Sequence, residues 1–442
     1  NLFNNIKNLK STDPLSMKHI RILRSFLSTT GAWPADYLGG KLTFMNKFFR
    51  KEIPCQATTL FFGVVYCIVR RSSVVDFMTL GDLYVTSFLC IITIAIPNFQ
   101  RYGELSKNFL MTFHLNNYKH KGGIYKEMHE RSEKFSYYFT LFMMVMMMIG
   151  CSLYNISPLL YNYNNGVFDK EIRQSKNITF QFSVLFLFPG FDPADHFFLT
   201  TGFNIYVSWT CSISLCGLDL FLCLMVFQII AHSKILKYNL EHLLDEEVVK
   251  KCTIENQAVV KLGSHENDAI NTKLKECVDH HRLIVSFAGD MSAFFGPLLA
   301  VNYLFHLVCC CLLLLECTVG DLAAAVRFTP LTLIIFGQLT IISVTFEVVD
   351  TESQKLPDAV YSIPWELMDV RNQRTVCLIL HRVQEPIRVT ALGLTAVGVQ
   401  TMAGVIRKTL GSSKKGENFT YVCKQPTLFF VKYYDTSVQS CS

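Results

Sequence analysis

The sequence predicts an all-α, polytopic membrane protein with seven transmembrane helices, a cytoplasmic N-terminus and an extracellular C-terminus. Half of its 442 residues are hydrophobic, 17% are charged, and the mean hydropathy is +0.29. Soluble domains carry roughly 25% charged residues. Seven stretches of 17 or more residues contain no Asp, Glu, Lys or Arg. A helix needs ~20 apolar residues to cross the ~30 Å hydrocarbon core, so each stretch predicts one span.

These stretches divide the chain into a seven-span domain, residues 1–410, and a polar tail, residues 411–442. The first, second and seventh are short or rich in Thr and Gly, so one of them could instead be a buried or re-entrant segment. The predicted spans cover approximately residues 53–69, 77–99, 135–157, 198–225, 291–315, 328–346 and 387–410.

Lys and Arg concentrate on the cytoplasmic side of short loops. With the N-terminus inside, the cytoplasmic segments hold nine, seven, eight and five of them, 29 in all, against 12 on the other side. Glycosylation sequons begin at Asn155, Asn177 and Asn418, all on the predicted outer side. Because Asn155 adjoins the third span, we expect Asn177 to be the glycan acceptor. The first thirty residues lack an apolar signal-peptide core, so the first span should act as an uncleaved anchor.

Aromatic residues, methionines and glycines in the spans suggest an adaptable apolar ligand pocket, because Met is polarizable and Gly leaves room. For any one of these residues, contact with lipid or another helix is the commoner alternative. The candidates lie in the middle or outer parts of spans two, three, four and six. The proposed ligand-binding residues are Tyr84, Phe88, Gly150, Tyr154, Tyr206 and Phe336.

Apolar residues at helical spacing continue beyond the membrane after span four, before span five and before span seven. They predict that helices four to seven extend into a cytoplasmic helical bundle. The apolar stripes could be buried within one chain, or they could form a subunit-assembly surface, for which the candidates are Trp365, Val376 and Leu380.

No catalytic, cofactor or metal site is expected. The sequence has no Gly-rich phosphate loop, no His-Glu-x-x-His motif, and no Cys-x-x-Cys spacing among its 16 cysteines. His280 and His281 stand side by side near a membrane edge, where a solvated pair is a simpler interpretation than a pH sensor.

Several blocks together resemble insect odorant receptors, and most closely the moth sex-pheromone receptor branch. They include the Ala-Val-Tyr to Pro-Trp block at 359–365 and Gln-Glu-Pro at 384–386. Phe-Pro-Gly-Phe-Asp-Pro at 188–193, Gly-Leu-Asp-Leu at 217–220 and Phe-Ala-Gly-Asp-Met-Ser at 287–292 also match. The resemblance covers roughly residues 10–410.

The resemblance implies a subunit of a ligand-gated cation channel in olfactory signal transduction, acting as a hetero-tetramer with a shared co-receptor. Spans two to six would surround a small, apolar, volatile ligand, the cytoplasmic ends of spans four to seven would form the subunit contacts, and the last helix would line the pore. The expected location is the plasma membrane of an olfactory neuron dendrite, with membrane lipid as a further partner and no nucleic acid.

The tail departs from the family pattern, because Leu410 is followed by Gly411 and by Lys414 and Lys415 where an apolar helix would end. A non-conducting, tail-altered isoform is therefore one alternative. Others are a G-protein-coupled receptor, which the predicted orientation opposes, and a secondary transporter, which would often show internal repeats that we do not find.

Overall fold

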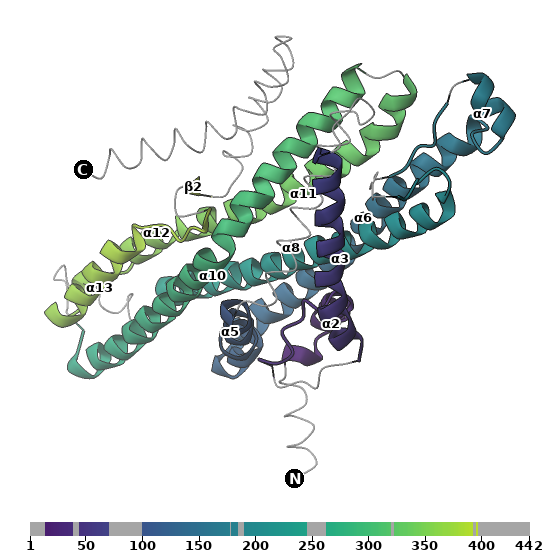
Figure 1. Cartoon of the computed structure of the whole chain (residues 1–442). Coiled ribbons are helices and arrows are strands. Elements are labelled where there is room, and N and C mark those ends of the chain that lie inside the picture. The colour runs from purple at the N-terminus through teal and green to yellow at the C-terminus, as the bar shows by residue number, and fades with distance from the viewer. Residues whose placement is uncertain are drawn as a thin grey trace.

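The computed structural model describes residues 14–38, 44–69, 100–176, 178–183, 190–244, 262–319, 322–391 and 395–396. Within these ranges the chain is helical almost throughout (Figure 1). The α-helices are α2 (Lys18–Thr29), α3 (Phe44–Val69), α5 (Gln100–Asn108), α6 (Gly123–Asn164), α7 (Lys170–Lys176), α8 (Phe197–Glu241), α10 (Ser264–Val319), α11 (Leu322–Ser353), α12 (Leu356–Tyr361) and α13 (Val370–Val383).

Short irregular helices connect these elements. A 3₁₀ turn, η1 (Pro14–Ser16), precedes α2, and another, η5 (Trp365–Leu367), precedes α13. Between α5 and α6 the chain passes through a π-helical turn, η3 (Phe109–Phe113), and a 3₁₀ helix, η4 (Leu115–Lys121). The backbone is extended at His114, whose Nδ1 accepts a hydrogen bond from the amide of Asn116 and so caps η4.

Three helices in the described part of the chain are long and apolar enough to cross a membrane. They lie within Gly123–Asn164, Phe197–Glu241 and Ser264–Ala300. At 1.5 Å per residue, the 45 residues of α8 span about 68 Å. That length is about twice the ~30 Å hydrocarbon core, so α8 continues well beyond the bilayer.

Five of the seven predicted spans fall inside helices: α3, α6, α8, α10 and α11. The second span, 77–99, lies outside the described residues. The seventh was predicted to begin at residue 387, and this start is too early. Instead of a helix, β1 (Thr390–Ala391) pairs antiparallel with β2 (Thr395–Ala396). Residues 397–410 and the tail lie outside the described ranges.

The long helices run in alternating directions, as consecutive membrane crossings require. Asn155 on α6 is hydrogen-bonded to Ser208 on α8. Ser132, which lies earlier on α6, is hydrogen-bonded to Gln228, which lies later on α8. The two helices are therefore antiparallel. Between α8 and α11, Cys216 is paired with Gln338 at 3.1 Å, and the Cys223 thiol interacts farther along with Thr345. Helices α8 and α11 are therefore parallel, which fits spans four and six.

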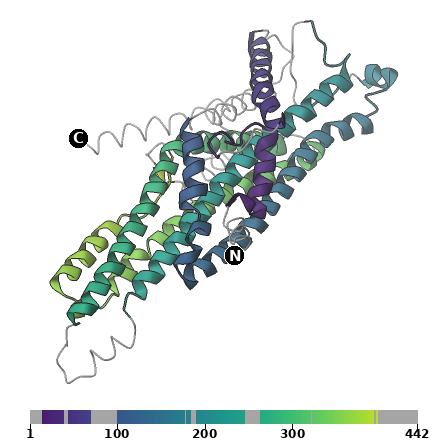
Figure 2. The ribbon, with the colours of Figure 1, turned by 90° about the horizontal axis from the view of Figure 1, so that it is seen from below.

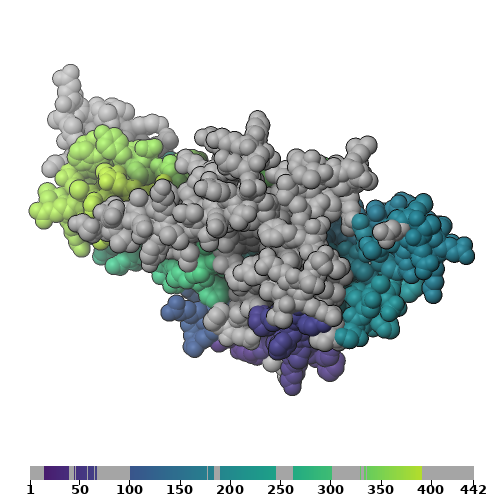
Figure 3. All heavy atoms as spheres, turned by 45° about the horizontal axis from the view of Figure 1, so that its top comes forward, coloured from purple at the N-terminus to yellow at the C-terminus, as the bar shows by residue number. Residues whose placement is uncertain are grey.

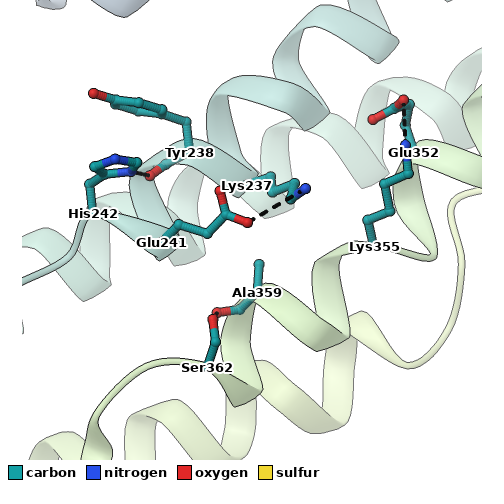
Figure 4. Close-up of polar contacts among 8 residues, drawn as sticks. All are labelled: Lys237, Tyr238, Glu241, His242, Glu352, Lys355, Ala359 and Ser362. Carbon is teal, nitrogen blue, oxygen red and sulfur yellow. Dashed lines mark hydrogen bonds and ion pairs between the residues drawn. The ribbon is translucent and has the colours of Figure 1, made fainter.

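The hydrophobic core is centred on α8, which packs against α2, α6, α10, α11 and α12 (Figure 2). Helices α8 and α10 pack against each other, and α7 and α13 lie at opposite ends of the molecule (Figures 1 and 3). Near the α13 end, α12 places Ala359, 2% exposed, against α8 (Figure 4).

Two ion pairs flank this contact between α8 and α12. Lys237 lies 3.5 Å from Glu241 on α8, and Lys355 lies 2.9 Å from Glu352 at the end of α11 (Figure 4). Since such pairs near the surface contribute only ~0–1 kcal/mol, the apolar core holds the bundle together.

The ends of α8 and α10 form a helical bundle with α12 and α13. Helix α8 continues to Glu241, α10 begins at Ser264, and α12 and α13 pack against them. Two side-chain contacts fix the start of α13. The Asp369 carboxylate caps the Asn372 amide at 2.9 Å, and Asn372 Nδ2 donates to the Asn267 carbonyl on α10 at 2.8 Å.

Candidate ligand-binding region

The four described ligand candidates lie on three helices that pack against one another. Gly150 and Tyr154 are on α6, Tyr206 is on α8, and Phe336 is on α11. The other two candidates, Tyr84 and Phe88, lie outside the described residues.

Residue pairs between these helices place the four candidates at a similar height. Asn155 meets Ser208, which brings Tyr154 and Tyr206 to one level. A Cβ atom added at Gly150 would lie 3.4 Å from Cγ2 of Ile334 on α11, two residues before Phe336. The three helices therefore bring the candidates to one region, at the end of the bundle near α7.

Gly150 marks a close approach between helices. It is buried, and its missing side chain lets Ile334 pack directly against the α6 backbone. At 3.4 Å a methyl group would make ordinary van der Waals contact, whereas a larger side chain would displace α11.

The two tyrosines are in different environments. The Tyr154 hydroxyl donates a 2.9 Å hydrogen bond to the carbonyl of Ser183, which holds a segment of the third loop against α6. Tyr206 is 38% exposed and lies beside the Glu52 carboxyl group of α3. One turn farther along α8, Thr210 is hydrogen-bonded to Gln56 of α3 at 2.8 Å. Helix α3 therefore contacts the same region.

A buried polar network, which the sequence analysis did not single out, joins α6, α8 and the third loop. We call Cys151, Asn155, Ser183 and Ser208 the Asn155 network. Asn155 is 6% exposed, and its Nδ2 donates to Ser208 Oγ at 2.7 Å and to the Cys151 carbonyl at 2.8 Å. Ser183 Oγ reaches Asn155 Oδ1 at 3.4 Å. The available signal was an Asn and several Ser residues inside an otherwise apolar stretch.

The third loop is fastened to the end of α6 by a second asparagine. Asn162 Nδ2 donates to the Gln181 carbonyl at 2.7 Å, and the Gln181 amide donates back to Asn162 Oδ1 at 2.9 Å. The backbone of Gln181 thus pairs with one side chain much as it would with a neighbouring strand. Next to them is a cluster of aromatic rings: Phe168, Phe180, Phe182 and Phe197.

The methionines of α6 divide between the core and the surface of the protein. Met143, Met144 and Met147 are buried, whereas Met148 is 43% exposed. The flexible, polarizable thioethers in the core can adapt to irregular apolar surfaces.

The three candidate subunit contacts differ in how far they are buried within the chain. Val376 is 5% exposed and belongs to the core of its own chain, and Leu380 packs against that core. Trp365 is 42% exposed. Part of this apolar stripe is therefore buried within one chain, which was one of the two alternatives left open by the sequence.

The pair His280 and His281 differs from the solvated pair expected from the sequence. His280 Nε2 lies 2.8 Å from His232 Nδ1, between α10 and α8. The two rings have their centroids 5.1 Å apart, and Tyr125 of α6 stacks on His280 at 6.0 Å. His280 thus contributes to helix packing.

Comparison with solved structures identifies the fold. The insect olfactory receptor OR5 from Machilis hrabei superposes with a TM-score of 0.63 at 16% sequence identity, covering 89% of this chain and 95% of that receptor. The structure of the same receptor in complex with eugenol also gives a TM-score of 0.63 at 16% identity, covering 90% and 97%. The chain therefore shares its predominantly helical fold with this protein.

Sequence relatives point in the same direction. Odorant receptor 10 of Aedes albopictus is 26% identical over 130 residues, 29% of this chain and 35% of that protein. Odorant receptor 22b of Drosophila melanogaster is 22% identical over 224 residues, 50% of this chain and 52% of that protein. The chain thus spans about a third and about a half of the lengths of these relatives.

The match to a protein-family model is more extensive. The model described as 7tm Odorant receptor aligns with residues 73–409, which include six of the seven predicted spans. A non-enzymatic, multi-pass receptor agrees with the absence of catalytic motifs from the sequence and with the helical fold. The chain belongs to the 7tm odorant receptor family.

Proposed function

We propose that this protein is the odorant-binding subunit of a ligand-gated cation channel and that it works with a shared co-receptor in olfactory signal transduction. The observation that carries this proposal is the family match over residues 73–409, supported by the fold shared with the Machilis hrabei receptor. The proposed location is the plasma membrane of an olfactory neuron dendrite, with the N-terminus in the cytoplasm.

The proposed ligand is a small, apolar, volatile molecule, and the moth-type sequence blocks favour a long-chain pheromone component. The Machilis hrabei receptor has been solved in complex with eugenol, which supports the small-molecule class. The ligand would bind among α3, α6, α8 and α11, near Gly150, Tyr154, Tyr206 and Phe336. Tyr84 and Phe88 complete the proposed set.

Subunit assembly is proposed to use the end of the bundle formed by α10, α12 and α13. The exposed Trp365 is the strongest of the three contact candidates, because Val376 and Leu380 already pack within the chain. Substitution of Trp365 by Ala should reduce co-purification of the co-receptor while the receptor itself still folds.

Co-expression with the co-receptor in oocytes tests the channel proposal. We expect currents evoked by pheromone components only when both subunits are present. Ligand-evoked currents of equal size without the co-receptor would contradict the subunit model. An N-terminal epitope accessible on intact cells would overturn the orientation and favour a G-protein-coupled receptor.

The ligand region can be tested with a pair of glycine variants. Gly150→Trp places a large side chain where a Cβ already contacts Ile334 at 3.4 Å, whereas a Cβ at Gly202 on α8 has open space around it. We expect Gly150→Trp to shift the concentration–response curve for bulky ligands and Gly202→Trp to leave it unchanged. An unchanged curve for Gly150→Trp would remove this glycine from the proposed site.

We also propose that the tail beginning at Gly411 limits conduction. Lys414 and Lys415 would gather at the outer mouth of a tetrameric pore and repel cations. The chain should still assemble and reach the membrane, because its cytoplasmic helices are intact. Recording this form beside one with an apolar helical tail decides the point, and equal currents at equal surface levels would show that the tail is harmless.

A further inference from the structure

Helix α2 combines a face buried against the helix bundle with a basic face on the outside. Ile20, Leu23 and Leu27 are at most 1% exposed, and His19 is 2% exposed. On the other side, Lys18 and Arg21 are exposed and Arg24 is half-buried. The helix contains no Asp or Glu.

Relative to the predicted spans, the contacts of α2 place it across one boundary of the hydrocarbon core. Near its C-terminal end, Leu27 packs on Gly217, eight residues inside the predicted end of span four at residue 225. At 1.5 Å per residue this is about 12 Å deep. Helix α2 also packs against α6, where His19 at its N-terminal end lies near His129. His129 precedes the predicted start of span three, residue 135, by six residues or about 9 Å.

This geometry brings the basic face of α2 to the level of the lipid headgroups. The boundary is the one at which span three begins and span four ends, which the distribution of Lys and Arg predicts to be cytoplasmic. An Arg or Lys side chain on the lipid-facing side of such a helix is costly in hydrocarbon, and it extends toward the interface.

The neighbouring elements leave the positive charge of this face uncompensated. From η4, Lys119 adds a cation that also acts on His114 and His129. The acidic side chains of α6 are largely engaged elsewhere, since Glu127 pairs with Arg131 at 2.6 Å and Glu133 lies 3.3 Å from His129. Glu130 is exposed. Among the described residues, none of the three α2 cations has a salt-bridge partner.

We propose that Lys18, Arg21 and Arg24 bind anionic lipid headgroups of the cytoplasmic leaflet, such as phosphatidylserine. The planar Arg guanidinium donates paired hydrogen bonds to phosphate or carboxylate oxygens, and Lys adds a point charge. Near an anionic membrane surface, each such cation raises the binding constant about five-fold. The interaction would hold α2 against the membrane and keep its apolar face on α8.

Native mass spectrometry of the purified full-length receptor tests this proposal. The receptor in detergent is given equal amounts of phosphatidylserine and phosphatidylcholine, and the ratio of the two bound lipids is measured. The test variant is Lys18→Gln/Arg21→Gln/Arg24→Gln. The matched control, Lys275→Gln/Arg374→Gln/Arg382→Gln, removes three exposed cations from α10 and α13, far from this boundary.

We expect the wild type and the control to prefer phosphatidylserine. In the test variant, the ratio of bound phosphatidylserine to bound phosphatidylcholine should fall at least about ten-fold. An Arg21→Lys/Arg24→Lys variant should retain it, and added salt should weaken it. An unchanged lipid ratio in the test variant, or an equal loss in the control, would overturn the proposal. Since the measurement uses no odorant and no current, it is independent of the proposed channel activity.

Discussion

The imidazole rings of His232 and His280 are joined by a hydrogen bond that links α8 to α10, with His232 Nδ1 2.8 Å from His280 Nε2. The other ring nitrogen of His232, Nε2, lies 2.7 Å from the carbonyl of Phe113 in the π-helical turn. Because a carbonyl can only accept, His232 must donate from Nε2, and its Nδ1 then accepts from His280. One backbone carbonyl thereby determines the tautomers of both histidines.

Replacing His280 by Phe should destabilise the receptor. The aromatic ring can still stack on Tyr125, but His232 Nδ1 loses its donor while remaining buried. Leaving such a group unsatisfied costs about 1–3 kcal/mol. We expect a lower melting temperature of the purified protein in detergent.

The matched control for this variant is His242→Phe, because among the described residues the His242 ring interacts with its own helix, through the Tyr238 carbonyl at 2.9 Å and the Tyr238 ring (Figure 4). The control should melt as the wild type does. Equal melting temperatures for all three proteins would show that the hydrogen bond between His232 and His280 does not stabilise the folded protein.

Acidification should destabilise the packing of α2, where the buried His19 lies near His114. Burial lowers the pKa of His19 from 6.5 to about 4, and burial together with the nearby His19 lowers the pKa of His114 well below its usual value. Both side chains are therefore neutral in the folded protein, whereas in the unfolded chain they take up protons below pH 6.5. The stability is present above pH 6.5 and is lost as the pH falls toward 4.

For His19 the loss amounts to roughly 1.4 kcal/mol for each pH unit in this interval. The melting temperature should therefore fall more between pH 7.5 and 5.5 in the wild type than in His19→Gln, which cannot titrate. Identical pH dependences would mean that His19 does not contribute.

Asn155 should carry no glycan although it begins a sequon. Its side-chain amide is buried and already bonded to Ser208 and to the Cys151 carbonyl. Asn177 lies outside the described residues and stays the predicted acceptor. Treatment with an endoglycosidase should increase the gel mobility of the wild type and of Asn155→Gln equally, and should not affect Asn177→Gln. A mobility shift that disappears in Asn155→Gln would contradict this assignment.

The sequence was sufficient to predict the fold class because charge-free stretches report directly on the thickness of the bilayer. Four of these stretches lie within α6, α8, α10 and α11, and the helices of three of them, α6, α8 and α10, are long and apolar enough to cross a membrane. The apolar stripe around Leu236 and Leu240 also predicted that α8 continues beyond the membrane, where both residues are 1% exposed. Composition fails at the start of the seventh span, where Thr390–Ala391 pairs with Thr395–Ala396 as two short strands.

The candidate site was only partly accessible from the sequence. Aromatic and small residues pointed to Gly150, Tyr154, Tyr206 and Phe336, but which face of a helix meets which neighbour depends on the packing of the whole bundle. The Asn155 network depends on contacts between residues 53 and 28 positions apart, so no local pattern reports it. The bond between His232 and His280 spans 48 positions and was missed for the same reason.

The close packing of α2 on α8 leads to a last prediction, for Gly217. A Cβ atom added there would lie 2.8 Å from Cδ2 of Leu27, which is itself fully buried. Such overpacking typically costs about 1–3 kcal/mol, more than the gain of up to about 1 kcal/mol from replacing Gly by Ala in a helix. Gly217→Ala should therefore lower the melting temperature.

Gly202→Ala on the same helix meets no atom within 4 Å and should leave the melting temperature unchanged or raise it slightly. If the clash with Leu27 is the cause, Leu27→Ala should cost less in the Gly217→Ala background than in the wild type, because it removes the methyl group that the new side chain meets. Strictly additive effects of the two substitutions would show that Leu27 of α2 does not press on Gly217. The contact used to place α2 at the membrane boundary would then be lost as an argument.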